Sequence, residues 1–367
     1  MTADSVKSHA EGERSLRLWA FGFCAKNSMK KILWVGSPFF SNMLGDMGWE
    51  DVYVHTPESF TLFTYENLVD VAGFTPDVLV VADRSFPPFV VGMEKAQCLT
   101  VLYVVDSHLH SWFPLYAQAF DLCLVSLFDH IPFFKTEILP SDRILWSPPY
   151  AQDAFRPKGS SELLWDCLFV GTVSENTPLR KIFLEKLSAY FPGLHVERGD
   201  FVSLFPKARV VLNFCEHGDL NFRVFEAMGL ASALVSPRIG NRQDALFTNG
   251  RDYLLYDPTN PSDPVDALRA IDRLLSDDRL RLSVQENALS RIDEKHRASH
   301  RARTFTEKVA ELWERKQSVV AHRLAISEYI RERFLKLLYL LWAKECQDDG
   351  IKGRYLAYAK GLGGRHG

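Results

Sequence analysis

The densest group of side chains able to do chemistry lies between residues 213 and 229. An apolar run ends at Asn213–Phe214, a polar loop containing a glycine follows, and the pattern predicts a helix from about Leu220–Asn221. Arg223 and Glu226 are three positions apart, on neighbouring positions of one helical face. An arginine near the start of a helix can bind a diphosphate, and a glutamate one turn later can accept hydrogen bonds from ribose hydroxyls. The simpler alternative is an ion pair between the two on a solvated helix.

A second group, Asp106, His108 and His110, directly follows a strong β-rich run. In a parallel sheet, the end of a strand is the edge at which ligands bind. An aspartate or a histidine at that edge could take the proton of a hydroxyl group. Alternatively, Asp106 only caps the start of the following helix.

Several common catalytic signatures do not occur in the sequence: a Walker A loop, HExxH, GxSxG, GxGxxG and Asp-x-Asp. His296 and His300 have the spacing of a metal-binding pair, but no carboxylate ligand is obvious nearby, and a packing role is the simpler interpretation. We therefore expect no bound metal. An anion would be held by helix N-termini, backbone amides and Arg or Lys side chains.

Short β-rich runs alternate with helical or loop segments along most of the chain. Most runs are continuously apolar, as expected for strands buried on both faces of a parallel sheet. The first series comprises Ile32–Val35, Val52–His55, Val78–Ala82, Val101–Val105 and Leu122–Leu127. The second series comprises Cys167–Val170, Leu194–Glu197, Val210–Phe214, Ala233–Ser236 and Tyr253–Tyr256. These runs predict two successive Rossmann-like α/β domains.

A Pro-rich, aperiodic segment over residues 147–157 separates the two series and predicts a linker. We expect a poorly ordered leader over 1–28, a first domain over 29–150 and a second domain over 151–305. Ligands would bind at the carboxyl ends of the strands and between the two domains.

Residues 306–367 are expected to form helices and a tail that pack back toward the first domain. The strongest helix is predicted from about Ser318 to Glu345. Its apolar positions on one stripe are Ile330, Phe334, Leu337, Leu338, Leu341 and Trp342. Packing against the protein body is the simplest interpretation of that stripe, with dimerisation or peripheral membrane contact as alternatives. The glycine-rich and basic end, residues 350–367, is expected to be a mobile tail.

The composition of the 367 residues limits the class of protein. Hydrophobic residues make up 47% and charged residues 24%, which excludes wholesale disorder. A formal net charge of −3 gives no overall signal for nucleic acid. The six cysteines are scattered without zinc-ligand spacing, as is usual in a reducing cytoplasm, and no apolar run is long enough to span a membrane. We therefore expect a cytoplasmic protein that binds no nucleic acid.

Together with its flanking strands, the 213–229 stretch resembles the carboxyl-terminal domain of GT-B glycosyltransferases. It is most similar to the CgeB-like (spore maturation protein) glycosyltransferase family, which has a group 1 glycosyltransferase-like carboxyl-terminal domain. That family reads roughly Asn-x-Arg-x-Phe-Glu-Ala before a small-residue turn and a strand. The resemblance spans about residues 165–310, and the first domain matches only in outline. Further segments in register are Leu168–Gly171 with Arg180, Leu246–Tyr256 and Lys295–Arg301.

The resemblance implies a GT-B fold, with two Rossmann-like domains facing a cleft and helices at the carboxyl end. It also implies an enzyme that moves a sugar from a nucleotide-diphosphate donor to a hydroxyl acceptor, with no metal and no further cofactor. Asn221 and Arg223 would contact the phosphates or the nearby sugar of the donor, and Glu226 would bind the ribose. Gly171 would let the donor approach the backbone, with Arg180 assisting.

The chain departs from the family pattern at one point. Retaining GT-B enzymes often carry a Glu-x7-Glu motif, but Gly218 stands eight residues before Glu226. Glu216 and Asp219 flank that place, so the sequence does not identify the carboxylate that faces the sugar.

In the first domain, Asp106 and His108 are the candidate catalytic residues. In an inverting transfer one of them would act as the base, whereas in a retaining transfer they would only position the acceptor. Two other functions stay open: a GT-B-shaped binding or scaffold protein without turnover, and a sugar-nucleotide epimerase.

Overall fold

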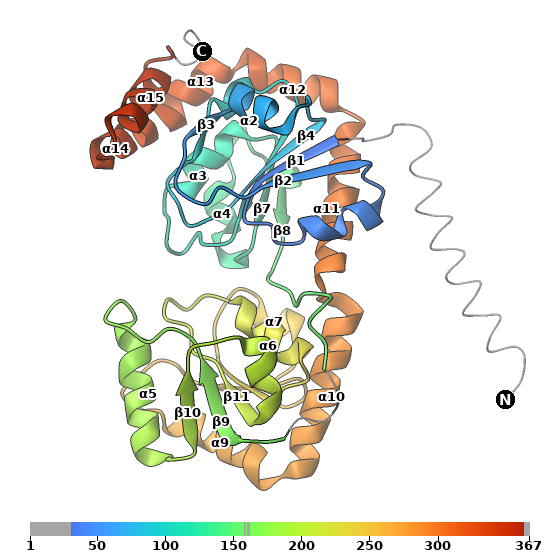
Figure 1. The fold of residues 1–367 in the computed structure, drawn as a ribbon, viewed down its shortest axis with the longest axis vertical. Coiled ribbons are helices and arrows are strands. Elements are labelled where there is room, and N and C mark those ends of the chain that lie inside the picture. Colours follow the sequence, from blue (N-terminus) through green and yellow to red (C-terminus); the bar gives the residue numbers. More distant parts are fainter. Residues whose placement is uncertain (1–30, 158, 160–161, 363–367) are drawn as a thin grey trace, which may run out of the picture. The chain divides into compact units, whose positions relative to one another are not determined.

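The computed structural model describes residues 31–157, 159 and 162–362 (Figure 1). The expected leader over 1–28 lies outside the described residues. Within them the chain forms two compact units.

The two units are not consecutive stretches of the chain. Unit 2 comprises Val125–Pro132 and Trp146–Arg301, and unit 1 comprises the remaining described residues. The boundaries therefore differ from those expected at 150 and 305. The segment around Asp129 belongs to unit 2 because the Asp129 carboxylate accepts a hydrogen bond from Asn241 N at 2.7 Å.

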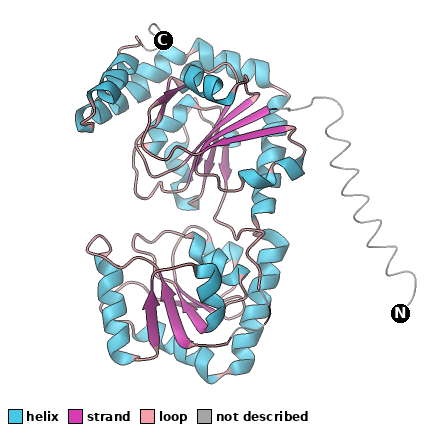
Figure 2. Ribbon diagram, viewed as in Figure 1, coloured by secondary structure: helices cyan, strands magenta, loops and turns pink. Residues whose placement is uncertain are grey.

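Unit 1 is built on a six-stranded sheet with the order β2-β1-β4-β6-β7-β8 (Figure 2). The pairs β1–β2, β1–β4 and β4–β6 are parallel. The strands are β1 (Lys31–Gly36), β2 (Asp51–His55), β4 (Val78–Ala82), β6 (Leu99–Val104), β7 (Leu122–Val125) and β8 (Ile144–Trp146). All residues of β4 and β6 are buried, which explains their continuously apolar sequences. The five predicted runs each coincide with a strand, and the short β8 was not predicted.

Unit 1 also contains a two-stranded parallel sheet of β3 (Phe63–Thr64) and β5 (Val90–Val91). Helix α2 begins at a reciprocal capping box, in which Thr64 and Asn67 each bond the backbone of the other. The shorter helices α3 and α4 follow β6 and β7. These helices span Tyr65–Ala72 (α2), Phe113–Tyr116 (α3) and Ile131–Phe134 (α4).

The carboxyl-terminal helices are tied to unit 1 by the buried side chain of Arg323. Its guanidinium donates to the Asp121 carboxylate at 2.9 Å and to the carbonyls of Met93, Ala96 and Cys98. These bonds satisfy the buried charge, so removing Arg323 would leave the buried Asp121 carboxylate with its hydrogen bonds from Thr100 but without its ion pair. The helices are α11 (Ala298–Trp313), α12 (Lys316–Ala325), α13 (Ser327–Ile330), α14 (Lys336–Glu345) and α15 (Asp349–Ala359).

Two expectations for this end of the chain are wrong. The single helix predicted from Ser318 to Glu345 is broken at Ile326, between α12 and α13, and contains one turn of π-helix at Arg331–Leu335, which rotates the following residues. Leu337 and Leu341, expected on the packed stripe, are therefore 74% and 50% exposed. Residues 349–359 form α15 in place of a mobile tail, because Asp348 caps the helix and Tyr355 is buried.

Unit 2 is built on a five-stranded sheet with the order β10-β9-β11-β12-β13, and each neighbouring pair is parallel. The strands are β9 (Trp165–Val170), β10 (Leu194–Glu197), β11 (Ala208–Leu212), β12 (Leu234–Pro237) and β13 (Leu254–Tyr256). All five were predicted, within two residues at each end. The order reverses at β9, so β9 and β11 flank the switch point of the sheet.

Helices cover both faces of the second sheet, with a hydrophobic cluster beneath each layer. The cluster under α7 and α10 includes Val224 and Ile292, and the cluster under α5 and α9 includes Leu187 and Ile271. The helices are α5 (Pro178–Tyr190), α6 (Phe201–Leu204), α7 (Phe222–Gly229), α8 (Gln243–Leu246), α9 (Val265–Ser276) and α10 (Asp278–Lys295).

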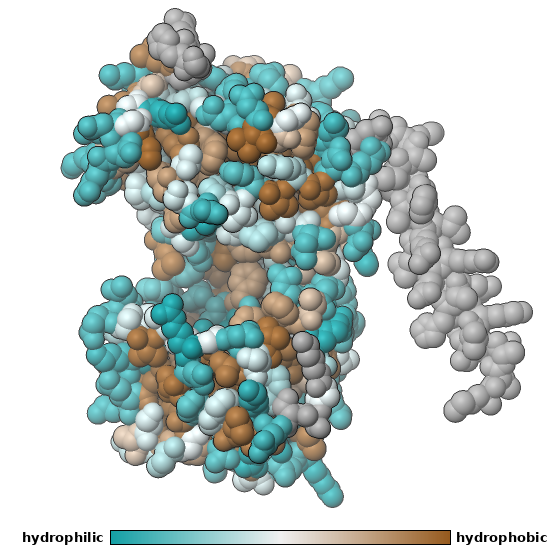
Figure 3. Space-filling model, in the orientation of Figure 1, coloured by the Kyte–Doolittle hydropathy of each residue, from teal (hydrophilic) through white to brown (hydrophobic). Residues whose placement is uncertain are grey.

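The space-filling view shows hydrophilic residues over most of the visible face, with hydrophobic residues in small groups between them (Figure 3). Among the described residues, no helix is both long enough and apolar enough to cross a membrane.

Candidate functional site

The switch point of the second sheet carries most of the predicted site residues. Gly171 directly follows β9, and Asn213 directly follows β11. Ligands of such sheets bind beyond the carboxyl ends of the strands at this point. The loops after β9 and β11 lead into α5 and α7, which carry the two arginines predicted from the sequence.

Arg180 and Arg223 both place their guanidinium groups against one aromatic ring, that of Phe169. The guanidinium carbons lie 5.8 Å and 5.1 Å from the ring centroid. Arg180 donates to the carbonyl of Thr172 at 2.8 Å, and its Nε is buried without a hydrogen-bond partner. Burial, followed by the nearby Arg180, lowers the pKa of Arg223. Neither arginine forms an ion pair within the described chain, although the charges of Glu226 and Asp219 partly oppose the lowering of the Arg223 pKa.

Asn213 fixes the position of Arg223. Its side chain is fully buried, and its Oδ1 accepts from Arg223 Nη1 at 3.1 Å. Its Nδ2 donates to Ser236 Oγ at 3.1 Å, and its carbonyl accepts from Tyr256 Oη at 2.9 Å. The sequence analysis did not assign a role to Asn213, although a polar residue at the end of a buried strand was the available signal.

Asn221 lies at the N-cap position of α7, as predicted. Its side chain does not cap the helix but exchanges hydrogen bonds with Asn213 and contacts Cys215 Sγ. The first turn of α7 therefore has no side-chain cap, and its N–H groups and dipole can attract an anion.

Glu216 is buried and faces helix α5. Its two carboxylate oxygens accept hydrogen bonds from Leu179 N and Arg180 N, each at 2.9 Å. This carboxylate accepts hydrogen bonds from backbone N–H groups in the first turn of α5 and so fixes the backbone that carries Arg180. The N-terminus of α5 is therefore already occupied, in contrast to that of α7.

Glu226 lies one turn after Arg223 in α7, but no ion pair or hydrogen bond joins them in the described chain. The interpretation of the two residues as a surface ion pair is therefore wrong: Arg223 turns toward Asn213. Burial raises the pKa of Glu226 to about 7, and the charge of Arg223 opposes that increase. A partly desolvated carboxylate of this kind can accept hydrogen bonds from hydroxyl groups.

Gly171 lies against the arginine site. A Cβ atom at this position would lie 2.9 Å from Arg223 Nη2 and 3.1 Å from the ring of Phe169. A larger residue would therefore press on the guanidinium that Asn213 holds in place.

In unit 1, Asp106 and His108 follow β6 in one turn. The carbonyl of Asp106 accepts from Leu109 N and His110 N, and its carboxylate accepts from Ser85 Oγ. The carboxylate is thus paired with Ser85 and caps no helix. Asp83, which the sequence analysis did not select, is buried and accepts from Ser85 N, Val105 N and Asp106 N at 2.7–2.9 Å. It fixes the backbone beneath Asp106.

The histidines considered as a metal pair lie in a packed region of unit 2. His296 packs against Phe225 and Phe247, and burial lowers its pKa to about 3. Beside it, Arg297 is 1% exposed and donates to the carbonyl of Gly229 at 3.0 Å. No cluster of potential metal ligands occurs among the residues that the structure describes.

Residues 183–307 match a family model described as glycosyl transferase-like. The matched segment contains α7 with Arg223 and Glu226. A comparison with curated proteins finds no match.

Several solved structures are similar to the chain. A glycosyltransferase from Rickettsia africae ESF-5 shares 10% identity, with 78% of this chain and 99% of that chain covered and a TM-score of 0.55. Alr3699/HepE from Anabaena, in complex with UDP-glucose, shares 11% identity, with 77% and 100% covered and a TM-score of 0.54. Sucrose-phosphate synthase from Thermosynechococcus elongatus shares 10% identity, with 78% and 100% covered and a TM-score of 0.53.

At this level of identity the structural similarity establishes the fold, and it confirms the predicted GT-B architecture. The family match agrees with the prediction of a glycosyltransferase that was made from the sequence of the second unit. Residues 183–307 thus match a glycosyl transferase-like family model within a chain that has the GT-B fold.

Proposed function

We propose that this chain transfers a sugar from a nucleotide-diphosphate donor to a hydroxyl acceptor, without a bound metal. The observation that carries the proposal is the pair Arg180 and Arg223, which both lie against the ring of Phe169 at the switch point and form no ion pair with any carboxylate of the described residues. Because the Anabaena protein of the same fold is in complex with UDP-glucose, UDP-sugars are the first donors to test.

In this proposal, the diphosphate of the donor lies between the two arginines and the uncapped start of α7. As the bond to the sugar breaks, negative charge grows on the leaving diphosphate. The N–H groups of the two arginines and of the start of α7 are already in place and stabilise that charge. Gly171 leaves room for the donor next to Arg223, and Asn221 lines the start of α7. Glu226 accepts hydrogen bonds from the ribose hydroxyls, which favour its charged form.

We propose that the transfer is independent of metal, because two guanidinium groups and a helix N-terminus supply the positive charge that a divalent ion would otherwise supply. The test is turnover in the presence of EDTA, followed by addition of Mg²⁺ or Mn²⁺. A requirement for either ion would contradict this part of the proposal.

Asp106 and His108 are proposed to bind the acceptor hydroxyl. The configuration of the product separates their two possible roles, because only an inverting transfer needs a base. We keep the CgeB-like subfamily and the cytoplasmic location as predictions from the sequence, and peripheral membrane contact as an open alternative.

The decisive experiment titrates a panel of nucleoside diphosphates and nucleotide sugars against the wild-type chain, Arg223→Ala and Glu226→Ala, by calorimetry. Arg223→Ala is expected to weaken binding about 100-fold, because two charge-assisted contacts are lost. Matched controls are Arg273→Ala and Glu286→Ala, which alter exposed residues on α9 and α10 of the same unit. If no panel member binds the wild-type chain, the proposal fails.

The same panel, scored for products, separates the alternatives. Slow release of free sugar from a bound donor supports a transferase even before its acceptor is known. Conversion of the donor to its epimer would identify a sugar-nucleotide epimerase. Binding without any turnover, with or without added acceptors, would favour a scaffold protein.

A further inference from the structure

Helix α14 of unit 1 presents three leucines on its outer face. Leu337, Leu340 and Leu341 are 74%, 39% and 50% exposed. Leu340 and Leu341 follow Leu337 by three and four positions, so the three side chains form one stripe along the helix. A single exposed leucine needs no explanation, whereas a contiguous stripe of them indicates a surface that contacts another molecule or a membrane.

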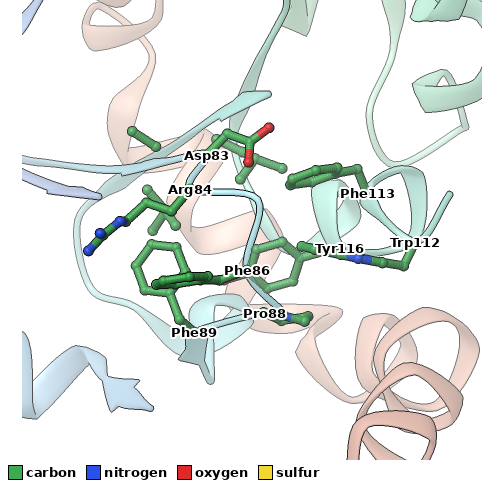
Figure 4. A pocket seen from close by; sticks show the side chains of 11 residues that line it. Asp83, Arg84, Phe86, Pro88, Phe89, Trp112, Phe113 and Tyr116 are labelled. Carbon is green, nitrogen blue, oxygen red and sulfur yellow. The ribbon is translucent and has the colours of Figure 1, made fainter. Parts of the chain in front are cut away.

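The opposite face of α14 packs against unit 1. Leu338 and Tyr339 are buried, and the ring of Trp342 meets that of Trp112 edge-on at a centroid distance of 6.4 Å. Trp112 belongs, with Tyr116, to the aromatic group that lines a narrow pocket of unit 1 (Figure 4). These contacts fix which side of α14 is turned outward.

The turn of π-helix at Arg331–Leu335 determines this orientation. Its additional residue shifts the helical pattern, so that Leu338 is buried while Leu337 and Leu341 turn outward. A regular α-helix continuing from Ile330 would place these two leucines on the packed stripe instead. Because π-helical turns are rare and occur frequently at functional sites, the exposure of the leucines indicates a function for this face.

Basic residues are interleaved with the leucines. Arg333, Lys336 and Lys344 are exposed. At about 100° per residue, they lie with the three leucines within an arc of about 140° of the helix surface, and that arc contains no acidic residue. Neither Arg333 nor Lys344 forms an ion pair with a carboxylate of the residues that the structure describes. Both charges are therefore available to an external anion.

The acidic residues closest to this arc lie at its border or beyond the helix. Glu332 is paired with Lys336 at 2.8 Å, and Glu345 borders the arc on the other side. Asp348 and Asp349 lie at the start of α15, where Asp348 caps the helix. The outward surface thus combines apolar and basic side chains, which suits the interface of a membrane that contains anionic lipids.

We propose that the outer face of α14 docks on a membrane surface that contains anionic lipids. The three leucines enter the region between the head groups and the acyl chains, while Arg333 and Lys344 extend their charged ends toward the lipid phosphates. The contact is peripheral, because the ten residues of α14 are about half of what a membrane-spanning helix needs. The proposal concerns unit 1 and is independent of the proposed function.

A second copy of the chain is the alternative occupant of this face. In a two-fold antiparallel pair of α14 helices, the start of one helix lies against the end of the other. Arg333 would then approach Lys344 of the second copy on the same flank of the pair. Because like charges at an interface are destabilising, the charges favour the lipid surface over a second copy.

The test is sedimentation of the full chain with vesicles of phosphatidylcholine alone, or of phosphatidylcholine and phosphatidylglycerol in equal parts. Binding to the mixed vesicles is expected, with binding to the neutral vesicles at least about ten-fold weaker, since each cation near an anionic surface contributes about 1 kcal/mol. Binding to the mixed vesicles should decrease as the salt concentration is raised.

Two double variants separate the contributions. Leu337→Ser with Leu341→Ser should weaken binding to the mixed vesicles about ten-fold, because the apolar contact is lost. Arg333→Gln with Lys344→Gln should remove most of the preference for anionic lipid.

The matched controls change exposed residues of unit 2 and should bind vesicles like the wild-type chain. They are Leu282→Ser on α10, and Arg269→Gln with Arg273→Gln on α9. Thermal melts establish that every variant is folded.

The proposal is overturned if the wild-type chain does not sediment with the mixed vesicles, or if the leucine variant binds them as well as the wild-type chain does. Analytical ultracentrifugation without lipid tests the alternative occupant. A dimer that the leucine substitutions dissociate, in a chain that binds no vesicles, would assign the face to a second copy. Nucleotide binding is measured separately and should be the same in both double variants and the wild-type chain, so its failure would affect only the proposed function.

Discussion

The switch-point regions of the two units share a topology but differ in electrostatics. Each sheet reverses its strand order at its first strand, and in each a polar loop follows the neighbouring strand. In unit 2, Asn213 holds Arg223 near Arg180, and the carboxylate of Glu216 fixes the start of α5, the helix that carries Arg180. In unit 1, Asp83 binds backbone N–H groups beneath a single arginine with aromatic neighbours. The fold therefore determines where a ligand can bind in each unit, and the residues of the loops determine the chemical character of that site.

The largest effect on stability is expected for Asp83→Ala in unit 1. The substitution leaves the N–H groups of Ser85, Val105 and Asp106 without their acceptor in a partly buried environment. A loss of about 3 kcal/mol in the free energy of opening this region is expected. Hydrogen exchange of residues 84–106 measures it, and Asp83→Asn, which keeps one acceptor oxygen, should lose less.

The same variant tests whether the switch point of unit 1 contributes to nucleotide binding by unit 2. Nucleotide binding by unit 2 should be unchanged in Asp83→Ala as long as unit 2 keeps its protection from exchange. A matching loss of nucleotide affinity in a folded unit 2 would contradict the assignment of different chemistry to the two switch points.

The next effect is the pH dependence introduced by Glu226. Its pKa is raised from 4.5 to about 7 in the folded chain. Between these pH values the folded state binds more protons than the unfolded state, so the free energy of unfolding falls as pH rises, by at most about 3 kcal/mol. His296 of the same unit, whose pKa is lowered to about 3, contributes the opposite change, because its unfolded form binds a proton up to about pH 6.5. The measurement is therefore the difference between the wild-type chain and Glu226→Gln: from pH 5 to pH 8 the wild-type chain should lose stability relative to the variant.

Nucleotide binding gives this prediction a second readout. Ribose hydroxyls that donate to Glu226 favour its charged form, so the affinity for UDP-glucose, whose diphosphate does not titrate in this range, should increase several-fold from pH 6 to pH 8. The increase should vanish in Glu226→Gln. If the affinity of that variant still increases with pH as in the wild-type chain, Glu226 does not bind the ribose.

The sequence predicted the strands and the start of α7 because both depend on local patterns. Continuous apolar runs mark strands buried on both faces, and the loop before Asn221 marks the beginning of a helix. Arg223 was identified by its place near the start of the predicted helix and Arg180 through the resemblance, whereas the ring of Phe169, against which both lie, was not identified. That contact joins residues from three different elements, and no local pattern records it.

Long-range contacts also explain the errors. Glu216 caps α5 across 36 positions of the chain, so its role could not be distinguished from that of a sugar-facing carboxylate. The exposure of Leu337 depends on a π-helical turn that a regular helical period does not anticipate.

Glu216→Ala tests whether a buried carboxylate supports the arginine site from behind. It removes the acceptor of Leu179 N and Arg180 N, and a loss of about 1–2 kcal/mol in the stability of unit 2 is expected. Because Glu216 is a positioning residue, KM for the donor should increase more than kcat falls. Glu185→Ala, which changes an exposed carboxylate on α5, is the control, and equal effects of the two changes would reject this role for Glu216.

The smallest effect is expected for Gly171→Ala. The added Cβ would lie 2.9 Å from Arg223 Nη2, so the guanidinium must shift by a few tenths of an ångström away from the position that Asn213 imposes. We expect KM for the donor to increase about three-fold, with the fold unchanged. Gly218→Ala is the opposite case: its backbone is left-handed (φ 71°), and nothing lies within 4 Å of the added atom. That control should lose about 1 kcal/mol of stability through backbone strain and leave KM unaltered. If Gly171→Ala also changes only stability and leaves KM unaltered, the contact of Gly171 with Arg223 and Phe169 serves packing alone. A small displacement of the Arg223 guanidinium would then not affect binding of the donor.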